Sequence, residues 1–276
     1  MKKLTNILPF AQPGSDEAYE LVRTENNFNC IEARNYVTEM WHRLDEMLDP
    51  DFVQNLGEGY YQRVWELYLG VSLLESRCKL ENKNASEGPD FKVVKPHHIW
   101  VEAIAPNQGS SSDAIPKKQP GAHPVPDEKI KLRITSAFWE KCKKFDHYRE
   151  KGIVGPHDAC VIAINGCRIP SALKERSDLP RVVRAFFPFG YETIYYDRET
   201  LSILKTDHQY QAEISRQAGD NIPMTLFQKG PQVSSISAIS AVIYTWADDL
   251  NHPNVGQPDL SRSGCDFMVV HNPLAS

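Results

Sequence analysis

The chain has 276 residues, 41% hydrophobic and 24% charged, with a formal net charge of −5 at pH 7. These proportions are typical of a globular protein with a buried core, and no apolar run approaches the ~18 residues of a membrane span. The six cysteines form no C-x-x-C pair, which argues against a disulfide framework or a zinc site. We therefore expect a cytoplasmic protein without a membrane partner, with a helical extension over residues 1–50 and a single domain over 51–276.

Two helices are predicted in the first third of the chain. Apolar residues recur at three- and four-residue steps over 31–48, which predicts the first helix. The segment 58–76 is apolar on most sides and predicts a second helix that is largely buried. This second helix contains Glu66, flanked by Trp65 and Leu67.

Three short strands are expected to follow. The segment 77–82 can form the first, and 91–94 and 99–105 are predicted as two more, joined by a turn at the sequence KPHH. Asp90 lies at the mouth of the second strand and Glu102 lies in the middle of the third. Burying a carboxylate charge is costly unless a partner takes it up, so both residues are candidates for a functional site.

A loop rich in proline, serine and glycine spans 106–126, and loops of this length are usually functional or disordered. The next helix is predicted over 127–148, because Pro126 and two acidic residues suit its start. A buried strand is predicted over 159–166. The remaining chain contains a predicted hairpin over 192–205 and further strands over 234–246 and 265–273.

From Glu58 to Asn165 the predicted order is helix, strand, strand, strand, helix, strand, with PD opening the second strand and a glutamate in the third. This arrangement resembles the PD-(D/E)XK nuclease superfamily, the restriction-endonuclease-like fold. The resemblance implies an α/β fold with a mixed central sheet flanked by helices. It also implies divalent-metal-dependent cleavage of phosphodiesters in nucleic acid. The stretches RVWELYLG, GPDF, IWVEAIAP and HNPLA are also similar to a family of uncharacterised bacterial proteins.

Whether Asp90 and Glu102 can form a metal site depends on the register in which the two strands pair. A turn centred on Pro96 places the two residues directly opposite each other, with Cβ atoms about 5 Å apart. Carboxylates that close repel unless a proton or a metal ion lies between them, and Mg²⁺ or Mn²⁺ favours such oxygen ligands. A turn centred between Pro96 and His97 would instead point the two acids to opposite faces of the sheet.

The chain departs from the superfamily pattern at the lysine that follows the glutamate by two residues, where it has Ile104. Lys92 and Lys129 are candidate replacements. Lys129 opens the helix expected beside the third strand, and we favour it because that helix also carries the excess of basic residues. From Lys117 to Lys151 there are ten lysines and arginines and five acidic residues, which predicts either a polyanion-binding face or a solvated helix. The alternative to an enzyme is a nuclease fold that has lost catalysis and acts as a binding or regulatory module.

The resemblance also implies a role for Glu66, because the corresponding helix supplies a third acidic group to the metal in some members of the superfamily. The other interpretation is an ion pair with an arginine such as Arg63, and both stay open. The candidate catalytic residues are therefore Asp90, Glu102, Lys129 and Glu66, and the candidate ligands of Mg²⁺ or Mn²⁺ are Asp90, Glu102 and Glu66.

The expected partner is nucleic acid, either DNA or RNA. Tyr195 and Tyr196 are candidates for stacking on bases, although packing within a strand is the default for such residues. The sequence is compatible with a homodimer but fixes no oligomeric state.

Overall fold

A computed structural model describes residues 8–83, 87–110, 112–116, 120–173, 179–217, 219–228, 234–248 and 266–275. At its centre is a six-stranded mixed sheet with the strand order β1-β2-β3-β4-β9-β10. Neighbouring strands are antiparallel from β1 to β3 and between β9 and β10, and parallel from β3 through β4 to β9. The strands are β1 (Lys79–Leu80), β2 (Phe91–Lys95), β3 (Ile99–Ile104), β4 (Ala159–Asn165), β9 (Ala241–Thr245) and β10 (Met268–His271).

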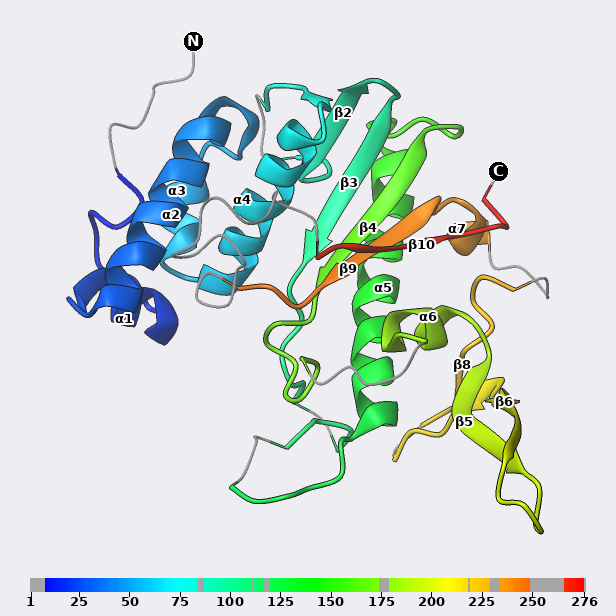
Figure 1. Ribbon diagram of the computed structural model, residues 1–276. Coiled ribbons are helices and arrows are strands. Elements are labelled where there is room, and N and C mark those ends of the chain that lie inside the picture. Colours follow the sequence, from blue (N-terminus) through cyan, green and yellow to red (C-terminus); the bar gives the residue numbers. More distant parts are fainter. Residues whose placement is uncertain are drawn as a thin grey trace.

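Helices cover both faces of this sheet, as Figure 1 shows. One face packs against α4 (Tyr60–Glu75), which is itself covered by α1 (Glu17–Thr24), α2 (Phe28–Leu44), the 3-10 turn η1 (Asp45–Met47) and α3 (Phe52–Leu56). The other face packs against α5 (Asp127–Glu150), together with α6 (Arg181–Phe186) and α7 (Ser234–Ser237). The predicted α/β architecture, a mixed central sheet flanked by helices, is confirmed.

The strand β3 contributes to both layers of the core, because successive side chains of a strand point to opposite faces. Val101 and Ala103 belong to the hydrophobic cluster on the α4 side. Ile104 belongs to the cluster on the α5 side. Glu102 therefore faces α5, in a position where the neighbouring side chains on the strand are apolar.

The order of elements predicted from the second helix to the buried strand is also confirmed, as α4, β1, β2, β3, α5 and β4. The first predicted helix, 31–48, is instead α2, which begins three residues earlier at Phe28 because the Asn27 side chain accepts a hydrogen bond from the Cys30 backbone N–H and caps the helix. The sequence pattern did not indicate α1, which Asp16 caps in the same way. Part of the predicted strand 234–246 is the short helix α7.

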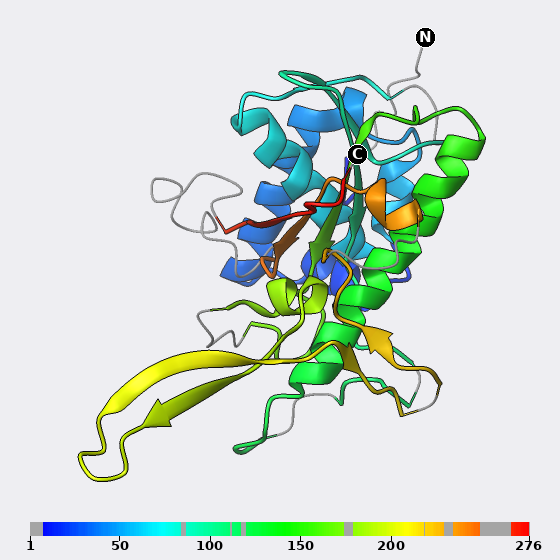
Figure 2. The ribbon, with the colours of Figure 1, turned by 90° about the vertical axis from the view of Figure 1, so that its right-hand side faces the viewer.

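Two small antiparallel pairs lie outside the central sheet. The predicted hairpin is present and longer than expected, with strands β5 (Phe189–Tyr196) and β6 (Ile203–Tyr210). Figure 2 shows this hairpin extending away from the body of the molecule. The second pair is β7 (Glu213–Ile214) with β8 (Ile222–Pro223). In the described part of the chain, no helix is both long enough and apolar enough to cross a membrane.

Candidate active site

The pairing of β2 with β3 brings Asp90 and Glu102 together. Phe91 pairs with Val101 and Val93 pairs with Ile99, so the turn is centred on Pro96. The next position of this register, one residue before β2, places Asp90 opposite Glu102. The register that a metal site requires is therefore the one that the strands adopt.

Asp90 also completes the hydrogen bonding of β3 where β2 ends. Its Oδ2 atom accepts a hydrogen bond from the Ala103 backbone N–H at 2.6 Å. The side chain of Gln62, on α4, satisfies the neighbouring backbone groups: it donates to the Ala103 carbonyl (3.1 Å) and accepts from the Ala105 N–H (2.8 Å). Backbone groups buried at a sheet edge need such partners, so both side chains are held firmly beside β3.

Glu102 is the most deeply buried charged group of the site, with 1% of its surface exposed. Two lysines of α5 compensate its charge: Lys141 Nζ and Lys144 Nζ donate to Glu102 Oε1 at 2.8 and 3.0 Å. Burial raises the pKa of Glu102, the nearby Asp90 carboxylate raises it further, and the two lysines act against this rise. Burial would lower the pKa of Lys144, but the Glu102 carboxylate raises it above its ordinary value.

Of the two interpretations of Glu66, the structure shows the ion pair with Arg63, and the role as a third metal ligand stays a prediction. It forms an ion pair with Arg63, whose Nη1 lies 2.6 Å from Glu66 Oε2, and Gln62 Nε2 donates to its other oxygen at 2.9 Å. It is also close enough to Asp90 for the two carboxylates to repel each other. Burial and then the Asp90 charge raise the pKa of Glu66 to about 7.

The expected role of Lys129 is wrong. Lys129 lies in the first turn of α5, and its amine donates to the backbone carbonyls of Ser112 and Ala114 at 3.4 and 3.2 Å. The part of α5 that reaches Glu102 lies twelve residues further along, at Lys141, which is about 18 Å along a helix. The other candidate, Lys92, lies 2.5 Å from Glu81 and over the Trp100 ring, and makes no contact with the site.

We expect Lys129→Ala to have only a small effect. The substitution removes two hydrogen bonds to a surface loop, which should lower the free energy of unfolding by about 1 kcal/mol or less. Mn²⁺ binding, measured by calorimetric titration, should remain at the wild-type level. A loss of Mn²⁺ binding in Lys129→Ala would show that Lys129 does act at the metal site.

Sequence reasoning missed Lys141 and Gln62, although each left a signal. Lys141 falls on the apolar stripe of its helix, three residues after Phe138 and four before Phe145. A lysine at such a position must be buried and needs an acidic partner. Gln62 lies one helical turn before Glu66 and so on the same face of α4. Asp49 had no such signal, yet its carboxylate is one of the charges that raise the pKa of Arg63.

The described cations between Lys117 and Lys151 differ in how far they are open to solvent. Lys117 and Lys118 lie outside the described residues. Several of the others serve internal contacts: Lys131 and Lys141 are buried, Arg133 donates to the Asn107 carbonyl, and Lys151 pairs with Glu87. Part of the positive charge along α5 is therefore used within the chain, while Lys143, Lys144 and Lys151 are exposed, and the polyanion-binding face stays a prediction.

The fit of a divalent cation to the site is best judged at Glu102. Its second oxygen, Oε2, is buried and accepts no hydrogen bond in the described part of the chain. A buried carboxylate oxygen without a partner, opposite a second carboxylate, suits a hard cation. Only the two carboxylates of Asp90 and Glu102 support this fit. The described residues contain no group of three or more acidic, histidine or cysteine side chains close enough together to hold a metal ion.

No protein-family model, curated protein or solved structure matches this chain. The resemblance to the PD-(D/E)XK nucleases stays a prediction from the sequence, based on the order of the elements and on Asp90 and Glu102.

Proposed function

We propose that the chain is a divalent-metal-dependent nuclease that hydrolyses phosphodiesters in nucleic acid. One observation carries this proposal. Glu102 is held between two lysines on one oxygen and has a buried, unpartnered second oxygen, with Asp90 opposite it. An acidic pair beside a lysine is the combination that the resemblance implies, and here α5 supplies the lysine that is missing at Ile104.

Each side chain would have a distinct task. Asp90 and Glu102 would hold Mg²⁺ or Mn²⁺, which when bound lowers the pKa of a coordinated water and neutralises charge on the phosphate. Lys141, which is buried, would favour the ionised form of Glu102, because its charge opposes the rise in the pKa of that carboxyl. The side chain of Lys144 is 48% exposed, so its amine can approach a phosphate oxygen from solvent. Glu66 would hold Gln62 and Arg63 in place behind Asp90.

The second candidate function is a nuclease-fold module that binds or regulates without catalysis. It is favoured by the same lysines, because two side chains of the chain itself compensate the charge of Glu102. The two functions share a fold and differ in whether the acidic pair binds a cation and whether cleavage follows.

The test is cleavage of single- and double-stranded DNA and RNA with Mg²⁺ or Mn²⁺, compared with a chelator. We expect cleavage that Asp90→Asn reduces to background, because the substitution removes a charged ligand and keeps an oxygen that can accept the Ala103 N–H. Glu140→Gln, at an exposed position on α5, is the matched control and should cut as the wild type does. Unfolding midpoints of both variants should stay near the wild-type value.

Two outcomes would separate the proposals. Binding of nucleic acid that weakens steeply with salt, without cleavage under any divalent cation, would support the inactive module. Cleavage that persists at the wild-type rate in Asp90→Asn would show that the Asp90–Glu102 site is not responsible.

A further inference from the structure

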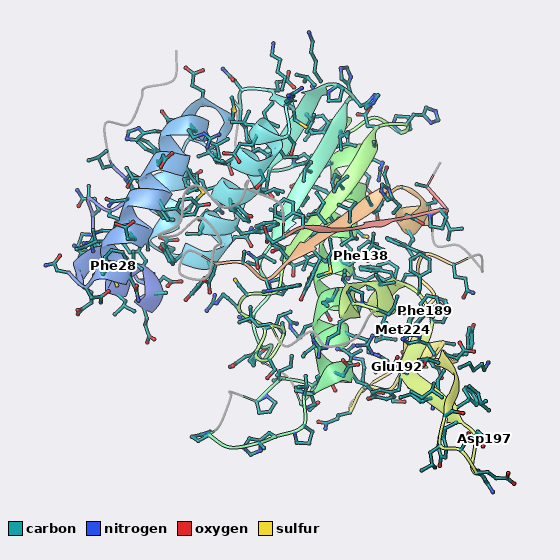
Figure 3. All side chains as sticks on the ribbon, viewed as in Figure 1. Phe28, Phe138, Phe189, Glu192, Asp197 and Met224 are labelled. Carbon is teal, nitrogen blue, oxygen red and sulfur yellow. The ribbon has the colours of Figure 1, made fainter. Side chains whose placement is uncertain are left out.

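The β5–β6 hairpin, which we call the arm, is a two-stranded ribbon whose two faces are exposed to solvent along most of their length. In β5 the only buried residue is Gly190, and in β6 none is buried. In Figure 3, Phe189 lies at its base, Glu192 lies along it and Asp197 lies near its far end. A two-stranded hairpin on its own is at best marginally stable in water, so an exposed one needs a reason to be retained.

The base of the arm is fixed to α5. Gln211, directly after β6, accepts a hydrogen bond from Lys131 Nζ (2.7 Å) and donates to Glu128 Oε1 (3.0 Å). Its backbone N–H donates to the Pro188 carbonyl, which closes the hairpin at its root. Lys131 is fully buried, so this connection is firm. The arm therefore projects from a defined position on the body.

The arm carries most of the exposed apolar surface of the described chain. Nine of the fifteen large hydrophobic residues that are exposed lie between 189 and 210, and their exposed fractions run from 41% to 73%. With about 200 Å² for each fully exposed side chain, they offer about 1,000 Å². One side of a standard protein–protein interface buries about 800 Å², and the nine side chains lie on both faces of the ribbon, so an interface on the arm would use part of this area. The nine are Phe189, Tyr191, Ile194, Tyr195, Tyr196, Leu201, Ile203, Leu204 and Tyr210.

The outer edges of the arm are open for pairing. Among the described residues no third strand joins β5 or β6. Proteins usually protect such edges with proline or lysine, but residues 189–210 contain no proline and a single lysine. The pairing is irregular near both ends and regular over Glu192–Tyr195. That regular run presents straight edges to which another strand can be added.

The charge of the arm argues against nucleic acid as its partner. Residues 189–210 contain four acidic and two basic side chains, a formal charge of −2, which would repel a phosphate backbone. The charges instead suit a second copy of β6. Within the strand, Lys205 and Asp207 form an exposed ion pair with 2.9 Å between Nζ and Oδ2. Written antiparallel to itself about Thr206, the strand also places Lys205 opposite the partner's Asp207, so the pairs of the two copies can join in one network of four charges across the axis.

We propose that the arm is a dimerisation element, in which the β6 edges of two copies of this chain pair about a two-fold axis at Thr206. The pairing turns two exposed ribbons into one four-stranded sheet and satisfies the open backbone groups of both edges. It also brings the apolar side chains of the two arms alongside each other. This interface is independent of the acidic site on the central sheet.

The test is the mass in solution, measured by sedimentation across the micromolar range. The wild type should sediment at twice the 31.4 kDa of the chain. Lys205→Asp places two acidic pairs across the axis and should weaken dimerisation about tenfold. The double variant Lys205→Asp/Asp207→Lys restores opposite charges and should recover the wild-type mass distribution. Lys143→Asp, at an exposed position on α5, is the control for charge alone and should leave the dimer intact.

A second variant tests the axis directly. Cysteines at position 206 of the two copies would lie within the Cα separation that a disulfide bridges, so Thr206→Cys should cross-link into a dimer on mild oxidation. Thr200→Cys, at the hairpin turn, should not. A monomeric wild type, or a dimer that neither the charge reversal nor the Thr206→Cys cross-link detects, would overturn the proposal. The proposal would also be overturned if the protein is a monomer and Tyr195→Ala abolishes its binding of nucleic acid, because the arm would then serve to stack bases.

Discussion

Replacing Lys141 with methionine should lower the free energy of unfolding by about 3 kcal/mol, because breaking a buried ion pair leaves an uncompensated charge in the core. Glu102 and Lys141 are 1% and 5% exposed, and their charged atoms lie 2.8 Å apart. Methionine keeps the length of the side chain and loses the charge. Lys144 stays near the carboxylate, but its side chain is half exposed, so it replaces only part of the lost interaction.

A double-mutant cycle measured by urea unfolding in the presence of a chelator would isolate this pair. Glu102→Gln should also destabilise the protein, because it leaves Lys141 buried without a carboxylate. The double variant Glu102→Gln/Lys141→Met should lose less than the sum of the two single losses. Lys143→Met, two residues along the same helix at an exposed position, is the control and should change stability by less than about 0.5 kcal/mol. Strictly additive losses would contradict a direct interaction between Glu102 and Lys141.

The second large effect concerns pH. Glu66 is buried, and its pKa is raised from 4.5 to about 7 in the folded protein. The folded state therefore holds this proton more tightly than the unfolded state does. The contribution to stability is fully present below pH 4.5 and is lost as pH rises through 7. A shift of this size corresponds to about 3 kcal/mol, at 1.36 kcal/mol for each pKa unit.

Glu66→Gln should remove this dependence. Gln cannot ionise, so the variant should gain stability relative to the wild type as pH rises from 5 to 8, by up to about 3 kcal/mol. Urea unfolding at several pH values measures the difference. Glu58→Gln, which removes an exposed carboxylate just before α4, is the control and should follow the wild-type curve. A Glu66→Gln variant whose stability stays parallel to the wild type across this range would show that Glu66 is ionised throughout.

The sequence was sufficient to predict the layers of the fold, because hydrophobic periodicity decides where α4, α5 and the central strands form. It also singled out the two acids of the site. It could not choose the register that places Asp90 opposite Glu102, since a turn centred half a residue away would have been equally acceptable locally. The basic excess of α5 favoured Lys129, but a count of charges does not show which lysine faces the sheet, whereas the apolar stripe of the helix includes Lys141.

Other features of the site depend on the tertiary fold. Asp49 follows η1, and its charge acts on Arg63 of α4. The two residues are brought near each other because α2 packs on α4, a contact that no local pattern encodes. The sequence also could not predict that the arm is exposed, because residues such as Tyr195 and Ile203 are equally common in strands that are packed against a second layer. Aromatic and β-branched residues favour strands whether or not a second layer covers them.

The helix α5 joins the two regions of the molecule for which a role is proposed. Lys131 fastens it to the base of the arm and Lys141 fastens it to Glu102, ten residues or about 15 Å further along. Both lysines are buried, so α5 fixes the distance between the two connections. In a dimer joined through the arms, the acidic sites of the two copies would therefore be held at one fixed separation.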